Sequence, residues 1–202
     1  MKHARKSTSQ RFRPRLAVTG SGLAAGLISS LAISALLLLV ERVSELPVGT
    51  FYLVLAFALL QTEEHTIGMV ALGFLMHLAA GSVIGLAISV PFSASRRLFA
   101  AGGKYAPAYG LAAGFVLWSA LFLPITYGIM LPLLNAADSQ AVMIRQKVPT
   151  GEAYTVAMGE LLAMMDRVVV GALAFNMFYG LLAVTLSRSL YEAYLRRNRI
   201  VL

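Results

Sequence analysis

Four long stretches of this chain contain no Asp, Glu, Lys or Arg, and they constrain the fold more than any other feature. They cover residues 16–40, 66–95, 105–137 and 168–187. About 20 apolar residues in a helix suffice to cross the hydrocarbon core of a bilayer, so each stretch is long enough to span it. We therefore predict an all-α fold, a polytopic membrane helix bundle with transmembrane helices at about 16–40, 67–92, 106–134 and 168–190.

The composition agrees with this fold and excludes several classes of function. Hydrophobic residues make up 58% of the 202 residues, which is too apolar for the surface of a soluble domain of this size. The chain has no cysteine, so disulfides, thiolate catalysis and iron–sulfur ligation are excluded within it. Nucleotide-binding loops, zinc-protease helices and nucleophile elbows do not occur in the sequence. We therefore expect a protein that is not an enzyme and carries no cofactor.

Basic residues alternate between abundant and scarce from one loop to the next. Segments 1–15, 96–104 and 188–202 hold 13 of the 17 Lys and Arg residues and one acid, whereas the remaining two loops hold four cations and eight acids. By the positive-inside rule, both termini should be cytoplasmic in a multi-pass protein of the inner (cytoplasmic) cell membrane. The net charge of +8 then favours anionic lipid headgroups at the basic termini as partners, rather than nucleic acid.

A fifth apolar run, at 46–60, is too short to cross the membrane. At about 1.5 Å per residue it reaches about 22 Å, whereas the bilayer core measures about 30 Å. We predict a short outer helix at about 47–60, either re-entrant or interfacial. The predicted organisation is a single membrane domain at 16–195 with an outer loop at 138–167 and a surface helix within 151–165, flanked by basic cytoplasmic tails at 1–15 and 196–202.

Small residues recur at four-residue spacing on three predicted spans. The pairs are Gly22 and Gly26, Gly81 and Gly85, and Gly110 and Gly114. Helix association in lipid depends on close backbone approach, which such pairs permit, and packing within the chain is favoured over an oligomer face. Gly-Leu-Ala-Ala-Gly occurs at both 22–26 and 110–114, which suggests a duplicated helix pair arranged as parallel repeats, with coincidence as the alternative.

His77 is the best candidate for a functional residue. It lies near the middle of the second span, on the face that carries Gly81 and Gly85. Ionisable groups inside a membrane are costly and often mark proton or substrate paths, and histidine changes charge near physiological pH. Asn176, near the middle of the fourth span, is the most plausible partner for His77. In the alternative interpretation both are neutral groups that only join helices.

The third span completes the candidate polar site in the bundle with Trp118, Thr126 and Tyr127. Trp118 shares the face of the glycine pair on this span, and Pro124 and Pro132 each remove a backbone donor. A helix broken at these prolines can line a small polar cavity with Thr126 and Tyr127. A simple helix kink at each proline is the alternative.

Glu63, Glu64 and His65 form a cluster of oxygen and nitrogen ligands at the outer edge of the second span. A divalent cation takes such ligands, but three adjacent residues at a helix start do not converge on one point. We interpret them as helix-start residues that complement the dipole, and we predict no metal site.

One part of the chain resembles a known group of proteins. The run from His77 to Gly85, followed by the glycines at 110 and 114 and by Trp118, Pro124, Gly128 and Pro132, is similar to the pattern of small prokaryotic four-helix membrane proteins of the YagU-like type. The resemblance covers roughly residues 66–134. It implies an inner-membrane protein associated with acid tolerance, in which His77 would have a protonation role.

Two functions remain open on the sequence alone. The first is a structural or accessory bundle that packs through its small-residue faces, either against other membrane subunits or against itself as a homo-oligomer. This hypothesis is slightly favoured. The second is a small transporter or a proton-responsive protein that works through His77, Asn176 and the third span.

Overall fold

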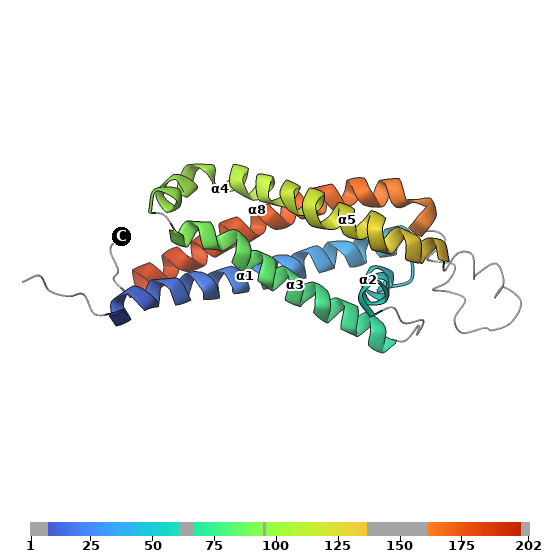
Figure 1. Cartoon of the computed structure of the whole chain (residues 1–202), viewed down its shortest axis with the longest axis horizontal. Helices are drawn as coiled ribbons and strands as arrows, with labels where there is room; N and C mark the ends of the chain where they lie inside the picture. The colour runs from blue at the N-terminus through green and yellow to red at the C-terminus, as the bar shows by residue number, and fades with distance from the viewer. Residues whose placement is uncertain (1–7, 61–66, 95, 137–160, 199–202) are drawn as a thin grey trace, which may run out of the picture.

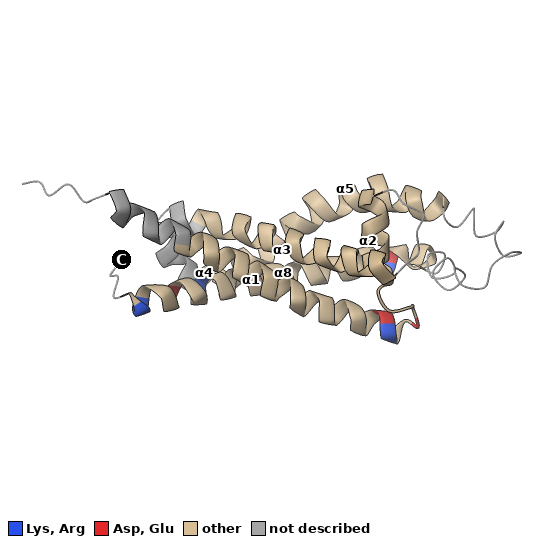
Figure 2. Ribbon diagram, turned by 90° about the horizontal axis from the view of Figure 1, so that it is seen from below, with Lys and Arg blue, Asp and Glu red and all other residues tan. Residues whose placement is uncertain are grey.

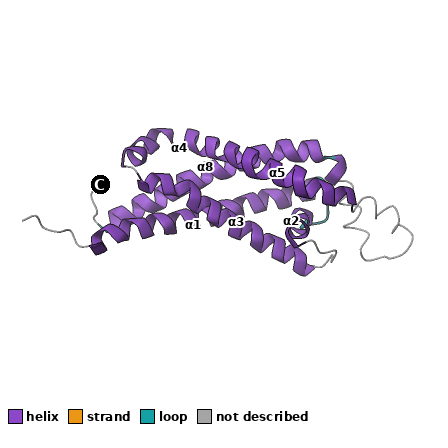
Figure 3. Ribbon diagram, in the orientation of Figure 1, coloured by secondary structure: helices purple, strands orange, loops and turns teal. Residues whose placement is uncertain are grey.

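The structure, a computed structural model, describes residues 8–60, 67–94, 96–136 and 161–198. Over these ranges the chain is helical and contains no strand (Figure 3). Four helices are long and apolar enough to cross a membrane: Ala17–Val43, Ile67–Pro91, Tyr105–Ala136 and Met165–Arg197. The predicted all-α bundle with four long apolar helices is confirmed, and the chain is a multi-pass membrane protein. Most of the predicted surface helix within 151–165 lies outside the described residues.

The long helices form two packed pairs. Helix α1 (Thr8–Val43) packs along α3 (Ile67–Ala94), and α4 (Arg96–Leu117) packs along α8 (Met165–Arg197). Extensive contact between α1 and α8 joins the pairs into one bundle (Figure 1). Helix α4 starts at Arg96, so the segment that the charge pattern treats as a loop is helical, although it contains two adjacent glycines at 102 and 103 besides good helix formers.

The third crossing is one continuous helix that contains two π-helical segments. Helix α4 is followed by η1 (Trp118–Phe122), α5 (Leu123–Ile125) and η2 (Thr126–Met130). The N–H of Leu123 donates to the Trp118 carbonyl and the N–H of Leu131 to the Thr126 carbonyl, which is the i to i+5 bonding of a π turn. A proline follows each of these donors directly and cannot donate. The chain therefore widens the turn before Pro124 and Pro132 instead of breaking there.

The short helix α2 (Thr50–Leu60) lies across α3 at the end of the bundle opposite the chain ends (Figures 1 and 2). Its 11 residues reach about 16 Å, too short for a crossing. It is nevertheless embedded, because Tyr52, Leu53, Val54 and Ala56 are all buried. Leu53, Val54 and Ala56 belong to an apolar cluster with Leu134, Leu161 and Met165 from the third and fourth crossings.

Charged side chains of the described residues gather at the two ends of the bundle, and its middle is uncharged (Figure 2). The middle core consists of apolar residues from all four long helices, among them Ile33, Ile88, Ala106 and Val184. At the end where α1 begins and α8 finishes, Val18 packs against Tyr191 and Leu195. This distribution fits a bundle whose middle lies in hydrocarbon.

Glycines bring the backbones together within each pair. A Cβ on Gly26 would overlap the Gly81 carbonyl oxygen, and a Cβ on Gly85 would overlap the backbone of Gly26. In the second pair, a Cβ on Gly114 would overlap the Asn176 carbonyl oxygen. These glycines therefore lie at contacts inside the chain, where only a hydrogen atom fits between the two helices.

Candidate functional site

The structure places His77 on the packed side of α3, facing α1 and α2. The backbone of Ser30 on α1 faces its imidazole, and the Tyr52 ring of α2 lies 5.9 Å away between ring centroids. The Nε2 atom of His77 is buried and has no hydrogen-bond partner among the described residues. A buried ring nitrogen without a partner is costly in an apolar surrounding.

Three hydroxyl groups from two helices join His77, and we name Ser30, Ser34, Tyr52 and His77 the polar core cluster. Ser30 and Ser34 follow each other at four-residue spacing on α1 and are 0% and 3% exposed. The Ser30 hydroxyl fills the space that a Cβ on Gly81 would need. Neither serine hydroxyl has a hydrogen-bond partner in the described part of the chain, and the same holds for the Tyr52 hydroxyl. The cluster thus collects three hydroxyl groups and one imidazole nitrogen that lack a partner at ordinary hydrogen-bond geometry within the described ranges, although the Ser34 and Tyr52 hydroxyls interact with each other and the imidazole interacts with the Ser30 backbone.

The position of Tyr52 depends on a close crossing of α2 over α3. A Cβ on Gly73 would overlap the backbone carbonyl of Tyr52, so α2 can reach this depth only because residue 73 has no side chain. The Tyr52 ring then packs edge-on against Phe74, with 5.4 Å between centroids. Burial raises the pKa of the Tyr52 phenol, a rise that the nearby Ser34 hydroxyl opposes and the Glu41 carboxylate increases, so the phenol keeps its proton at neutral pH.

Glu41 is the polar residue that the sequence pattern misplaces. Its position directly after an uncharged stretch indicates an outer loop, whereas the structure puts it inside α1 with a side chain that is 0% exposed. Its Oε2 accepts the N–H of Gly49 at 2.7 Å, and its Oε1 accepts the N–H of Phe51 at 2.8 Å. Glu41 therefore caps the start of α2, where the helix dipole favours a negative charge.

A sequence signal for Glu41 does exist. Glu41 follows Ser34 by seven residues, and Ser34 follows Ser30 by four, so the three residues lie along one face of the helix. That face begins with Gly22 and Gly26 at the same spacing. Extending the small-residue face beyond the uncharged stretch would have found the carboxylate.

The structure does not join Asn176 to His77 by a hydrogen bond. The Asn176 side chain donates to the Ala172 carbonyl on its own helix at 2.8 Å, while its backbone carbonyl faces Gly114. The predicted partnership with His77 is therefore replaced by a local bond within α8. Tyr52, which the sequence pattern did not single out, is the ring that lies beside His77.

The remaining predicted site residues lie on the third crossing and make separate contacts. The Trp118 indole donates to the Val169 carbonyl of α8 at 3.0 Å. Thr126 in η2 is 1% exposed, and its hydroxyl has no hydrogen-bond partner among the described residues. Tyr127 is 51% exposed and faces outward. The predicted pairing of Thr126 and Tyr127 around one cavity is not what the structure shows, because successive residues of a helix point in different directions.

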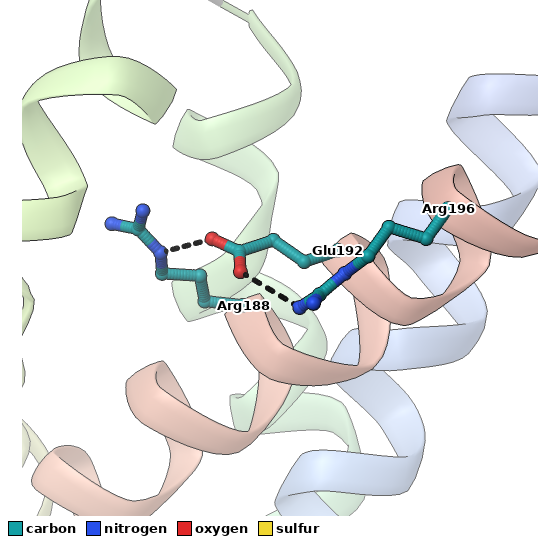
Figure 4. Close-up of polar contacts among 3 residues, drawn as sticks. All are labelled: Arg188, Glu192 and Arg196. Atoms are coloured by element: carbon teal, nitrogen blue, oxygen red, sulfur yellow. Dashed lines mark hydrogen bonds and ion pairs between the residues drawn. The ribbon is translucent and has the colours of Figure 1, made fainter. Parts of the chain in front are cut away.

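The opposite end of the bundle carries an ion-pair chain on α8 (Figure 4). Glu192 accepts from Arg188 at 2.6 Å and pairs with Arg196 at 3.6 Å. Arg196 is 79% exposed, so the second pair adds little stability. These residues form a basic surface at the helix end rather than a site with converging groups.

The described residues contain no group of three His, Asp or Glu side chains that could hold a metal ion. The predicted helix-start cluster of Glu63, Glu64 and His65 lies outside those residues. What remains is a set of neutral hydrogen-bonding groups around an imidazole, which can bind or pass a proton or hold a small polar molecule. No family model matches the chain, and no curated protein or solved structure matches it.

Proposed function

We propose that the chain is a non-enzymatic membrane protein that binds a proton or a small polar solute at the polar core cluster, as a small transporter or a proton-responsive protein. One observation carries this proposal. The hydroxyls of Ser30, Ser34 and Tyr52 and the Nε2 atom of His77 are buried near one another, and in the described part of the chain none of these atoms has a partner at ordinary hydrogen-bond geometry beyond the weaker contact between Ser34 and Tyr52.

Energetics supports a functional role for these groups. An unpaired hydroxyl or imidazole nitrogen in an apolar environment costs about 1–3 kcal/mol by protein mutational data. A serine in a helix can return its hydroxyl to the carbonyl one turn back, as Ser82 does to Leu78 at 2.8 Å, but Ser30 and Ser34 do not. A bound water, proton or polar solute would supply the missing partners and recover this free energy.

Chemistry favours a cargo that exchanges hydrogen bonds with neutral groups. Each hydroxyl can both donate and accept, and the imidazole can take up a proton. No Lys, Arg, Asp or Glu belongs to the polar core cluster, and the charge that acts on it, the Glu41 carboxylate near Tyr52, would repel an anion. These features suit a proton, water or a small uncharged molecule, and a protonation role for His77 would agree with the YagU-like resemblance.

The proposed orientation places both termini in the cytoplasm of a cell whose inner membrane holds the bundle. The basic surface formed by Arg188, Arg196 and Arg197 supports this orientation by the positive-inside rule. In the same arrangement these cations would meet anionic lipid headgroups. The polar core cluster would then lie toward the outer half of the bundle, because Tyr52 belongs to α2, which lies at the end opposite the chain ends.

The second candidate is an accessory role, in which the bundle packs against other membrane subunits or a second copy. The glycines at 22, 26, 110 and 114 contact other helices of the chain itself, so the partner surface would lie elsewhere. Large exposed side chains on α4, which the other long helices carry as well, offer one such surface: Tyr105, Phe115 and Val116 are 58%, 50% and 57% exposed. Native mass spectrometry after gentle extraction tests it, since stoichiometric partners support it and a lone monomer contradicts it.

Proteoliposomes test the first proposal. We expect His77→Gln to reduce proton flux under an imposed pH gradient, or the osmotic uptake of small neutral solutes, by at least about tenfold. Asn176→Ala is the matched control, because Asn176 is also a polar residue in a span but bonds only to its own helix. Equal flux from the unchanged chain, His77→Gln and empty liposomes in both assays would refute the proposal.

A further inference from the structure

We propose that α2 is a lid over the polar core cluster and that Glu41 is the latch that holds this lid closed. The lid would control access from the membrane face opposite the chain ends. The inference rests on the proposed function, since it assigns regulation to the same site.

The latch consists of two hydrogen bonds that one buried carboxylate accepts. Glu41 belongs to α1, whereas its two partners, the N–H groups of Gly49 and Phe51, lie at the start of α2. Both carboxylate oxygens are used, at 2.7 and 2.8 Å, and the side chain is fully buried. Charge-assisted bonds of this kind are stronger than neutral ones. Glu41 therefore ties the start of α2 to α1, while the buried apolar residues of α2 hold the rest of the helix in the bundle.

The proposed lid, α2, packs very closely against α3. Gly73 lets the Tyr52 backbone approach α3 at a distance that no side chain would allow, and Phe74 holds the Tyr52 ring edge-on. At the start of α2, Gly49 lies against the Val70 side chain. Any shift of α2 away from α3 therefore withdraws Tyr52 from the cluster.

Tyr52 is the cluster member that a lid movement would displace. Ser30 and Ser34 belong to α1 and His77 to α3, and these two helices are locked together by their glycines. Tyr52 alone comes from α2, where it lies beside the His77 ring and near the Ser34 hydroxyl. Moving α2 would uncover the serines and the imidazole without separating the long helices.

A hinge for the lid would lie in the short turn between α1 and α2. Glu45 has a φ of 59° and Gly49 a φ of 93°, so two left-handed residues flank a short turn between the helices. Helix α2 is too short to span the bilayer, and it is apolar on its exposed side, with Leu59 and Leu60 55% and 48% exposed. A released α2 would therefore bring no charge of its own into the outer part of the bilayer.

Thiol labelling tests the lid directly, because the natural chain contains no cysteine. The reporter is Ser34→Cys, a small change at a position 3% exposed under α2. A membrane-impermeant cationic thiol reagent is applied separately to each face of sealed vesicles. Two variants open the lid by different means: Glu41→Gln replaces one acceptor oxygen by a donor, and Gly73→Ala pushes against the Tyr52 backbone.

We expect each variant to speed labelling of Ser34→Cys at least about tenfold, and only from the face opposite the chain ends. For Glu41→Gln this is the ratio expected for losing one bond to a buried charged group. Ser187→Cys is the matched control, because Ser187 is also buried, at 4% exposure, but lies on α8 near the other end. Its labelling should stay slow in both variants. If Glu41→Gln does not fold, Gly73→Ala decides the question alone.

Three results would overturn the lid: unchanged labelling in both variants, an equal increase at Ser187→Cys, or labelling from the face of the chain ends only. Labelling requires no transport, so its outcome is separate from that of the flux assay. Unchanged labelling together with flux that depends on His77 would refute the lid and leave the proposed function standing. Faster labelling of Ser34→Cys in both variants, together with flux that does not depend on His77, would support the lid and refute the proposed function.

Discussion

The two helix pairs of this protein use the same packing register. In α1–α3, a Cβ on Gly22 would meet Leu86 and a Cβ on Gly26 would meet Gly81. In α4–α8, a Cβ on Gly110 would meet Leu181 and a Cβ on Gly114 would meet Asn176. The partner positions are five residues apart in both pairs, so the two copies of Gly-Leu-Ala-Ala-Gly contact equivalent places on their neighbours.

The pairs differ one and two turns beyond this shared contact. Four and eight residues after the second glycine, α1 carries Ser30 and Ser34, whereas the third crossing carries Trp118 and Phe122. Four residues before Gly81, α3 carries His77, whereas α8 carries Ala172 at the position four residues before Asn176. The second pair packs with apolar groups in the positions that hold the polar core cluster in the first.

This difference separates packing from the proposed function. Close contact between the helices requires the glycines, which both pairs have, and does not require a histidine or serines. The polar groups of the first pair are therefore an addition to a packing scheme that works without them. The shared register also supports the predicted duplication into parallel repeats, with the polar site belonging to one repeat only.

The largest expected effect comes from filling a glycine contact in either pair. Gly85→Leu and Gly180→Leu would each force a side chain into the backbone of the facing helix, at Gly26 and Gly110 respectively. We expect each to lower the free energy of unfolding by at least about 3 kcal/mol, the upper range of overpacking costs. Unfolding in detergent, followed by the fluorescence of the single tryptophan, measures the change.

Gly171→Leu is the control for this comparison. Gly171 lies on α8 like Gly180, but a Cβ there would meet no atom within 4 Å. Leucine should be tolerated there and should help the helix, since glycine is a poor helix former. If only one of Gly85→Leu and Gly180→Leu lowered the free energy of unfolding, the two pairs would not be equivalent.

A smaller effect of opposite sign is expected at the polar core cluster. Ser30→Ala with Ser34→Ala removes two buried hydroxyls without partners and makes the first pair resemble the second. We expect the double variant to be more stable by about 1–2 kcal/mol, from relieved desolvation, and to lose most of its flux in liposomes. Such a trade of function for stability is common at binding sites.

Thr185→Ala provides the contrast for the serine variant. Thr185 bonds its hydroxyl to the Leu181 carbonyl on α8 at 2.8 Å, so its removal should leave stability unchanged or slightly lower. Stability and flux are measured on the same preparations. Destabilisation by the serine double variant would show that the hydroxyls serve packing, and would remove the distinction between the two pairs.

Features that depend on residues close together in the sequence could be predicted, whereas features that depend on contacts between distant segments could not. The four crossings are readable because each is a long stretch without charge, and His77 is readable because the glycines at 81 and 85 mark its face. These are local signals along one helix. The sequence therefore fixes the number of long helices and the packed face of α3 with little ambiguity.

The rest of the site depends on contacts between helices. Tyr52 enters the cluster only because Gly73 lets α2 cross α3 closely, a contact that no spacing along α2 indicates. Glu41 resembles any acid after a membrane span until the turn at Glu45 and Gly49 brings α2 back onto it. Asn176 is a polar residue in the middle of a span, but its bond to Ala172 takes it out of the site. In each case the role of the residue depends on how the helices pack in three dimensions, which spacing along one helix does not reveal.

The smallest expected effect concerns one of the hydrogen bonds between the two pairs. Tyr179 on α8 donates its hydroxyl to the Gly81 carbonyl on α3, four residues after His77. Tyr179→Phe removes this bond and keeps the ring in the core. Hydrogen bonds between membrane helices contribute about 0.6 kcal/mol on average and about 1.7 kcal/mol at most, so the loss should fall in this range.

Tyr127→Phe is the control for this prediction, because the Tyr127 side chain is 51% exposed on the outside of the bundle, whereas Tyr179 is 7% exposed. Its effect on unfolding should be within about 0.5 kcal/mol, as for most surface substitutions. A loss above about 2 kcal/mol in Tyr179→Phe would mean that the two pairs depend on each other through this bond. They would then be halves of a single unit, and the polar groups of the first pair could not be treated as an addition to an independent packing scheme.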